Sequence, residues 1–346
     1  MKVAITLVGG NLSSSRYSHK AGWAHLWACQ LKNKFGFDVT VITENQSWNH
    51  FDRVYLYHSM EFQGTLNLFG GASEESAKFY ERIITVNPNV ELISLDIPMP
   101  DYGTLCKGRL KSCEDYWRNV NWDAVTEKCK TIPHFTQADL KLNSLIVGDS
   151  HAFSVYDGKS MVLRKDGRTL NGVLKKSIKK EILDHGFDLD SIDTIISYYG
   201  NIDIRHHIMR NFNVVEYVEM LVKSYEKSLQ ELGKKIKIVF PLPIEDESRR
   251  LPKTGYFEGT PFFGSTKERQ EVVRVFSYYL SEMCSSNKWE TIKWPTEWYT
   301  ISPLSYMKDY MERPKSVHLA PIHHKWNYWD NKPNSVTPTT ISLKNF

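Results

Sequence analysis

The chain has 346 residues, of which 41% are hydrophobic and 24% charged, a balance typical of soluble globular proteins. Its formal net charge of +4 permits a nucleic-acid partner without requiring one. No apolar run approaches the ~20 residues of a membrane span, and the five irregularly spaced cysteines indicate neither a zinc site nor a disulfide framework. We therefore expect a cytoplasmic protein with no membrane partner, no metal and no cofactor.

The first hundred residues alternate between strand and helix patterns. Short β-branched strands separated by amphipathic helices indicate a parallel sheet with helices on both faces. The expected strands are residues 2–10, 38–43, 51–59 and 90–98, and the expected helices are residues 19–36 and 73–86. We predict a Rossmann-like domain over residues 1–100.

Residues 101–143 break this alternation, because they are polar and poor in strand signals. We interpret them as a connector between two domains. A second alternation then fills residues 144–346. Its expected strands are residues 143–148, 192–200, 235–243 and 289–294, and its expected helices are residues 173–185, 214–233 and 266–284. The predicted fold class is α/β, with two Rossmann-like three-layer α/β/α domains.

The stretch Leu145–Tyr156, LIVGDSHAFSVY, raises the main functional question. A buried strand that ends at Ser150 would place this serine at the carboxyl edge of a parallel sheet, where open α/β sheets bind ligands. The N-terminus of a following helix would add N–H groups for an oxyanion. The alternative is that Ser150 or Asp149 only caps that helix.

A second polar cluster follows a strand in the stretch IISYYGNIDIRHHI. The amide of Asn201 is a candidate donor to a developing oxyanion. Asp203, Arg205 and His207 occupy alternate positions and would share one face of an extended segment. A solvent-exposed loop with a local Asp–Arg pair is the alternative.

The tail carries the third cluster, KSVHLAP. A nucleophilic serine needs a base within hydrogen-bond reach, and His318 is the candidate. His323 and His324 are its competitors. Three clusters in the order Ser, Asn, His, two of them at predicted sheet edges, favour an active site.

These motifs resemble the SGNH (GDSL-type) hydrolases over about residues 144–325. Gly148, Asp149 and Ser150 match the first block of that family. Asn201 matches the third block one place early, and His318 matches the fifth. Gly172 matches the second block, and Gly200 and Asp203 also match the third. Lys315 departs from the pattern, because it occupies the position where the family has an acid.

The resemblance implies a flavodoxin-like parallel sheet and a serine mechanism. Ser150 would attack an ester carbonyl, and His318 would take its proton. The N–H groups of Ser150 and Gly172, with Asn201, would hold the oxyanion. Asp309, Glu312 or a backbone carbonyl would replace the missing acid. The residues expected to bind substrate around this site are His151, Asp203, Arg205 and His207.

The first hundred residues resemble the N-terminal half of phage DNA glucosyltransferases. The features that carry this resemblance are the opening MKVAIT, Asp52-Arg53 before a strand, the Phe69-Gly70-Gly71 turn, and the strand end Asp96–Pro98. It implies an acceptor or DNA-binding domain. Gly70 and Gly71 would allow close approach of a ligand to the backbone, and an ordinary turn is the alternative.

Three functions follow from these observations. The first is an SGNH-type esterase or acyltransferase, phage-encoded, acting on an acyl-sugar or on modified, glycosylated double-stranded DNA in the host cytoplasm. The second is a glycosyltransferase that modifies phage DNA. The third is an inactive DNA- or glycan-binding protein, which Lys315 favours. The retained serine, asparagine and histidine favour the first.

Overall fold

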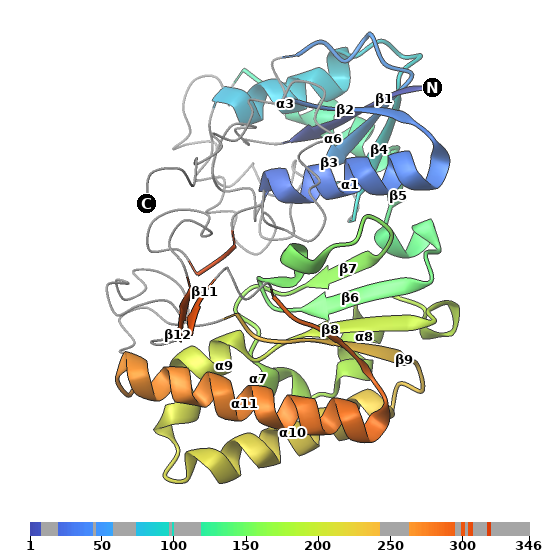
Figure 1. Cartoon of the computed structure of the whole chain (residues 1–346). Coiled ribbons are helices and arrows are strands. Elements are labelled where there is room, and N and C mark those ends of the chain that lie inside the picture. The colour runs from blue at the N-terminus through green and yellow to red at the C-terminus, as the bar shows by residue number, and fades with distance from the viewer. Residues whose placement is uncertain are drawn as a thin grey trace, which may run out of the picture. The chain divides into compact units, whose positions relative to one another are not determined.

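The computed structural model describes residues 1–7, 20–43, 46–57, 74–96, 99, 119–242, 263–294, 299–301, 304–306 and 317–319 (Figure 1). The chain divides into two compact units, with the boundary between Leu140 and Lys141. Both units are α/β and each is built on a five-stranded sheet. The predicted fold class is therefore confirmed. Among the described residues, no helix has both the length and the apolar composition needed to cross a membrane.

The sheet of the first unit has the strand order β2-β1-β3-β4-β5. Every neighbouring pair is parallel; Ile5, for example, lies opposite Val41 on one side and Tyr55 on the other. Four of these strands match predicted strands, and the short β5 was not predicted. The strands are β1 (Lys2–Leu7), β2 (Asp38–Thr43), β3 (Arg53–Tyr57), β4 (Glu91–Leu95) and β5 (His134–Phe135).

Residues 119–140 belong to the first unit and not, as was predicted, to a connector between two domains. They form α6 (Trp122–Lys130), β5 and the 3-10 turn η3 (Gln137–Leu140), all within the first unit. Strand β5 joins the sheet because Ser94 and Asp96 donate backbone hydrogen bonds to Pro133 and Phe135. Two paired residues are too few to produce a recognisable strand pattern in a sequence.

In the described part of the first unit, two helices besides α6 cover this sheet, namely α1 (Lys20–Phe35) and α3 (Glu74–Thr85). Because side chains alternate along β3, Val54 and Leu56 face one side of the sheet and Tyr55 faces the other. The first side packs on α3 and α6. The ring of Tyr55 lies 6.4 Å from Phe135, whose ring lies 5.9 Å from Trp27 of α1. Helix α1 therefore covers the opposite face.

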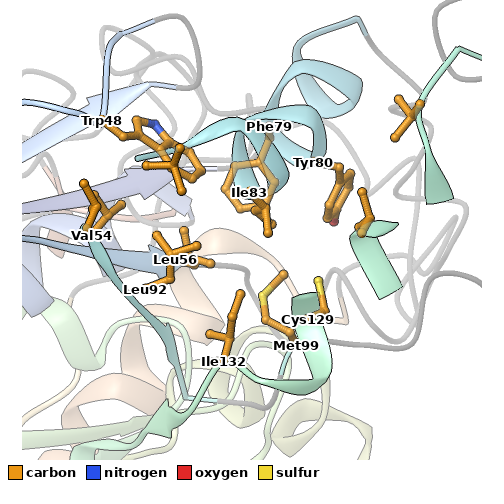
Figure 2. Close-up of a cluster of buried hydrophobic side chains, with 14 of the residues drawn as sticks. Trp48, Val54, Leu56, Phe79, Tyr80, Ile83, Leu92, Met99, Cys129 and Ile132 are labelled. Atoms are coloured by element: carbon orange, nitrogen blue, oxygen red, sulfur yellow. The ribbon is translucent and has the colours of Figure 1, made fainter. Parts of the chain in front are cut away.

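Figure 2 shows the buried core between this sheet and the helices α3 and α6. The ring of Phe79 lies 5.6 Å from that of Trp48 and 5.1 Å from that of Tyr80, both at edge-to-face angles. All three side chains are fully buried. Such aromatic packing contributes much of the apolar surface that stabilises a small domain.

The sheet of the second unit has the strand order β10-β9-β8-β6-β7, again with every pair parallel. The edge strand β7 was not predicted, because it has only four residues. The strands are β6 (Ser144–Gly148), β7 (Met161–Arg164), β8 (Thr194–Tyr198), β9 (Lys235–Val239) and β10 (Glu290–Ile292). A separate antiparallel pair is formed by β11 (Tyr299–Ile301) and β12 (Leu304–Tyr306).

Two long helices, α10 (Val214–Gln230) and α11 (Thr266–Asn287), lie on the same side of this sheet (Figure 1). Helix α11 begins with a capping box between Ser265 and Glu268. The predicted helix over residues 173–185 is instead two short helices, because Ser177 between them has a φ of 72°. They are α7 (Leu170–Leu174) and α8 (Ile178–Asp184).

Both sheets have the strand order 2-1-3-4-5 when each is numbered along its own chain segment. This is the flavodoxin-like order, in which the connections leave the first and third strands in opposite directions. In sheets of this kind, ligands bind outside the carboxyl ends of these two strands. In the second unit, they are the ends of β6 and β8.

We expect Phe79→Ala to lower the free energy of unfolding of the first unit by roughly 3–5 kcal/mol, because it leaves a cavity in a closely packed core. Denaturant unfolding followed by fluorescence would measure the change. Phe212→Ala is the matched control, since this ring is fully exposed, and it should change stability by less than about 0.5 kcal/mol. Equal effects of the two substitutions would contradict the described core.

Candidate active site

The site begins where β6 approaches the end of β8. A Cβ atom on Gly148 would lie 2.5 Å from the carbonyl oxygen of Tyr198, so any larger residue would push the two strands apart. The next residue, Asp149, donates its backbone N–H to the same carbonyl oxygen at 3.2 Å. This close approach holds the chain after β6 against the carboxyl end of β8.

Asp149 closes the turn that carries Ser150. Its Oδ1 accepts the backbone N–H of His151 at 2.9 Å, and its carbonyl oxygen accepts the N–H of Ala152 at 3.1 Å. The segment that follows is the four-residue 3-10 turn η4 (Ala152–Val155). The prediction that a helix after Ser150 would direct its N-terminus at an oxyanion is therefore wrong, because one 3-10 turn has no appreciable macrodipole.

The hydroxyl of Ser150 faces a histidine. Its Oγ lies 2.8 Å from Nε2 of His318, which is 168 residues away in the sequence. Both residues are partly exposed, while the neighbouring Leu319 is buried. This is the geometry of a serine and its general base. Ser150 does not cap the following 3-10 turn, because the N-cap of that turn is His151.

Asn201 connects three strand ends around this pair. It is the first residue of α9 (Asn201–His206). Its Oδ1 accepts the backbone N–H of Leu242, after β9, at 3.2 Å, and its Nδ2 lies 3.5 Å from Oδ2 of Asp149. Gly200 starts this helix with a φ of 107°, and a Cβ there would lie 2.8 Å from the ring of Phe276. Asn201 is thus buried and fixed beside the turn that carries Ser150.

The segment after Asn201 is helical, which corrects the extended segment predicted for Asp203, Arg205 and His207. Successive helical residues turn by about 100°, so alternate positions do not share a face. Asp203 is fully buried and accepts the N–H groups of Leu170 and Asn171 at 2.6 and 3.1 Å. Its carboxylate therefore holds the start of α7 and is not presented to a ligand.

The other two residues of this set differ in exposure. Arg205 is buried, and His207 at the end of α9 is partly buried. Burial, followed by the charge of Arg210, lowers the pKa of His207. Binding of substrate by either side chain stays a prediction.

Gly172 lies in α7, and its N–H donates to Oγ1 of Thr169 at 2.9 Å. Thr169 is the N-cap of this helix, so the N–H serves a local cap. This contact gives no support to the prediction that Gly172 helps to hold an oxyanion. The sequence signal for the cap is a threonine three residues before the glycine.

His151 was predicted to bind substrate, and its contacts show a different position. Its Nδ1 lies 2.9 Å from Oδ1 of Asp149, and its Nε2 lies 3.0 Å from the carbonyl oxygen of Val317. Its side chain is 1% exposed. A buried ring with both nitrogens on protein groups is not a substrate-binding residue, which corrects that prediction.

Several predicted residues lie outside the described part of the chain. They are Gly70, Gly71, Asp309, Glu312, Lys315, His323 and His324. Within the described part, no group of three or more His, Cys, Asp or Glu side chains is arranged to hold a metal ion.

The contacts that sequence reasoning missed are mostly made by backbone atoms. The carbonyl groups of Tyr198 and Val317 and the N–H of Leu242 each contact a polar residue of the site. A backbone group carries no residue-type signal, so only the folded arrangement of the strands reveals it.

Comparison with known proteins finds no matching family model and no matching curated protein. Solved structures do match. A GDSL-like lipase from Bacteroides thetaiotaomicron is 12% identical over 55% of this chain and 83% of its own, with a TM-score of 0.37. A Streptococcus pneumoniae protein described as a platelet activating factor is 16% identical over 55% of this chain and 81% of its own, with a TM-score of 0.38.

A Desulfitobacterium hafniense protein described as lipolytic and of the G-D-S-L family also matches. It is 12% identical over 49% of this chain and 86% of its own, with a TM-score of 0.31. The sequence identities and TM-scores of all three matches are low, so these matches do not establish a function for this chain. The resemblance of the first unit to phage DNA glucosyltransferases stays a prediction.

We expect Asp203 to make stability fall as the pH rises from about 4 to 6. Burial, more than the nearby Asp149, raises the pKa of Asp203 from 3.8 to about 6, against the effect of its backbone hydrogen bonds. The folded state then holds this proton more tightly than the unfolded state, so ionisation lowers the free energy of unfolding by roughly 3 kcal/mol across this window. Asp203→Asn should lack this component when unfolding is measured at several pH values.

Asp184→Asn is the control for this measurement. Its hydrogen bond to Lys180 lowers the pKa of Asp184, so its effect lies below about pH 4. A constant difference between native protein and Asp203→Asn from pH 4 to 6 would contradict the prediction.

Proposed function

We propose that the second unit is a serine hydrolase that cleaves esters through an acyl-enzyme on Ser150. The single observation that carries this proposal is the 2.8 Å contact between Oγ of Ser150 and Nε2 of His318. A serine hydroxyl is a weak nucleophile at neutral pH, and a histidine in this position is the base that activates it.

The first step forms a bond between Oγ of Ser150 and the ester carbonyl carbon. The serine proton passes to Nε2 of His318 as this bond forms. The tetrahedral intermediate then collapses, the ester C–O bond breaks, and the leaving alkoxide takes the proton from His318. Water attacks the acyl-enzyme in the same way, with His318 again as base, and the acid product is released.

The negative charge on the carbonyl oxygen needs hydrogen-bond donors during these steps. An asparagine amide has two N–H groups, and Asn201 directs its amide toward Asp149 beside the turn. We assign the second N–H of Asn201 and the backbone N–H of Ser150 to the oxyanion. Gly172 is left out, because its N–H serves the cap of α7.

The proposal also names a class of substrate. The sequence resemblances imply an acyl-sugar, or modified double-stranded DNA that carries one. A sugar hydroxyl in place of water would make the same acyl-enzyme a transferase. The contact between Ser150 and His318 favours an enzyme over an inactive binding protein, since an inactive scaffold has no need for a base on that serine.

A fluorophosphonate probe should label the native protein, and labelling should be lost in Ser150→Ala and reduced at least about 100-fold in His318→Ala. Both changes remove one partner of the activated pair. Gel fluorescence and mass spectrometry of the labelled peptide would identify the site.

The matched controls remove a serine and a histidine elsewhere in the same unit. Ser224→Ala removes an exposed hydroxyl on α10, and His185→Ala removes a ring that contacts the carbonyl oxygen of Glu181. Both variants should label at the native rate. An unlabelled native protein that is folded by circular dichroism would overturn the proposal.

Asn201→Ala should lower kcat for p-nitrophenyl acetate by about 100- to 1000-fold, because removal of one oxyanion donor has this effect in other enzymes. Steady-state hydrolysis would measure it. Asn211→Ala is the control, since the contacts of this amide within the described residues are to the backbone carbonyls of His207 and Ile208. A native kcat in folded Asn201→Ala would remove this residue from the oxyanion site.

A further inference from the structure

His151 joins the nucleophile turn to the segment that carries His318. One ring nitrogen lies on the carboxylate of Asp149, and the other lies on the carbonyl oxygen of Val317, the residue before His318. We infer that His151 is a doubly protonated positioning residue which, paired with Asp149, holds His318 in place for catalysis. This inference rests on the proposed function of Ser150 and His318.

The protonation state follows from the contacts. A carbonyl oxygen only accepts hydrogen bonds, so Nε2 of His151 must donate to Val317 at 3.0 Å. Oδ1 of Asp149 also accepts the backbone N–H of His151, so Nδ1 meets an acceptor as well, at 2.9 Å. A neutral imidazole has one N–H, and two donated bonds require an imidazolium.

The charged state is supported by its surroundings. The side chains of His151 and Asp149 are 1% and 0% exposed, and charges at such depth occur paired and hydrogen-bonded. Asp149 has donors on both oxygens, with His151 on Oδ1 and the Asn201 amide 3.5 Å from Oδ2. The pair has no net charge, which limits repulsion when His318 accepts a proton.

The hydrogen bond from His151 to Val317 acts on the backbone of His318, the proposed base. A carbonyl group is rigidly connected through its peptide plane to the next residue, so a hydrogen bond to Val317 restricts the backbone of His318. The rings of His151 and His318 also lie close, with centroids 4.8 Å apart at 47°. Two contacts thus fix the direction from which His318 approaches Ser150.

This arrangement offers a physical role for the histidine after the nucleophile. In a Ser-His-Asp triad the acid holds the ring of the base directly. Here the buried Asp149–His151 pair acts through the backbone that precedes the base, from the same turn that carries the nucleophile. Serine and base are therefore aligned by one ion pair.

The test compares the rate of fluorophosphonate labelling in His151→Leu and His151→Gln, in the full chain. Leucine fills a similar volume but donates no hydrogen bond, whereas the glutamine amide can still donate to Val317. We expect labelling to slow by about 100-fold in His151→Leu, the cost of a misplacement near 1 Å, and by clearly less in His151→Gln. His185→Leu, which removes a histidine–carbonyl contact remote from this pair, should label at the native rate.

The outcomes separate this inference from the proposed function. Native labelling with unchanged rates in both His151 variants would overturn the inference and leave the hydrolase intact. Equal loss in both variants would also overturn it, because the role would then be packing rather than hydrogen bonding. An unlabelled native protein would overturn the proposed function and this inference together.

A second measurement does not depend on any variant folding. Nitrogen-15 NMR of the histidine rings in the native protein distinguishes an imidazolium from a neutral ring by the shifts of both nitrogens. Two protonated nitrogens on His151 at neutral pH are the expected result. A single protonated nitrogen would contradict the inferred ion pair.

Discussion

The close approach of β6 to the carboxyl end of β8 is the constraint on which the site depends. Gly148 has no Cβ, so the backbone of Asp149 can donate to the carbonyl of Tyr198. This contact places Asp149 beside Asn201, next to the turn from which Ser150 contacts His318. The flavodoxin-like strand order places these strand ends at the point where the connections after β6 and β8 diverge, the place where such sheets bind ligands. Backbone geometry, more than any single side chain, therefore determines where the nucleophile lies.

The residues proposed to react differ in solvent exposure from the residues that hold them in place. Ser150 and His318 are partly exposed, whereas Asp149, His151 and Asn201 are buried at the same strand ends. Buried polar groups are costly unless each finds a partner, and a fully partnered network is rigid for the same reason. The supports therefore restrict the motion of the two groups that reach solvent. Rigid positioning of this kind is what a serine and its base require.

Much of the fold follows from hydrophobic periodicity, which is strong in long segments such as α10, α11 and β1. It fails for β5 and β7, since two and four residues carry too little pattern. At the site, Ser150 was predicted from its place at a strand end, and His318 was predicted as its base from the tail motif KSVHLAP. The prediction that Asp203 and Arg205 share one face of an extended segment was wrong, because a helix starts there after Gly200. The role of His151 was missed because its partner is the backbone of a residue 166 positions away.

The separation of 168 residues between Ser150 and His318 has a consequence for the newly made protein. At about 5–20 residues per second, the ribosome adds the histidine roughly 10–30 s after the serine. Strands β6, β8 and β9 are complete well before that, so the sheet can form while Ser150 still lacks its contact with His318. Reactivity is then conferred late, by the arrival of one short segment. The order of synthesis thus delays the proposed acyl chemistry in the growing chain until nearly all of the second unit has been made.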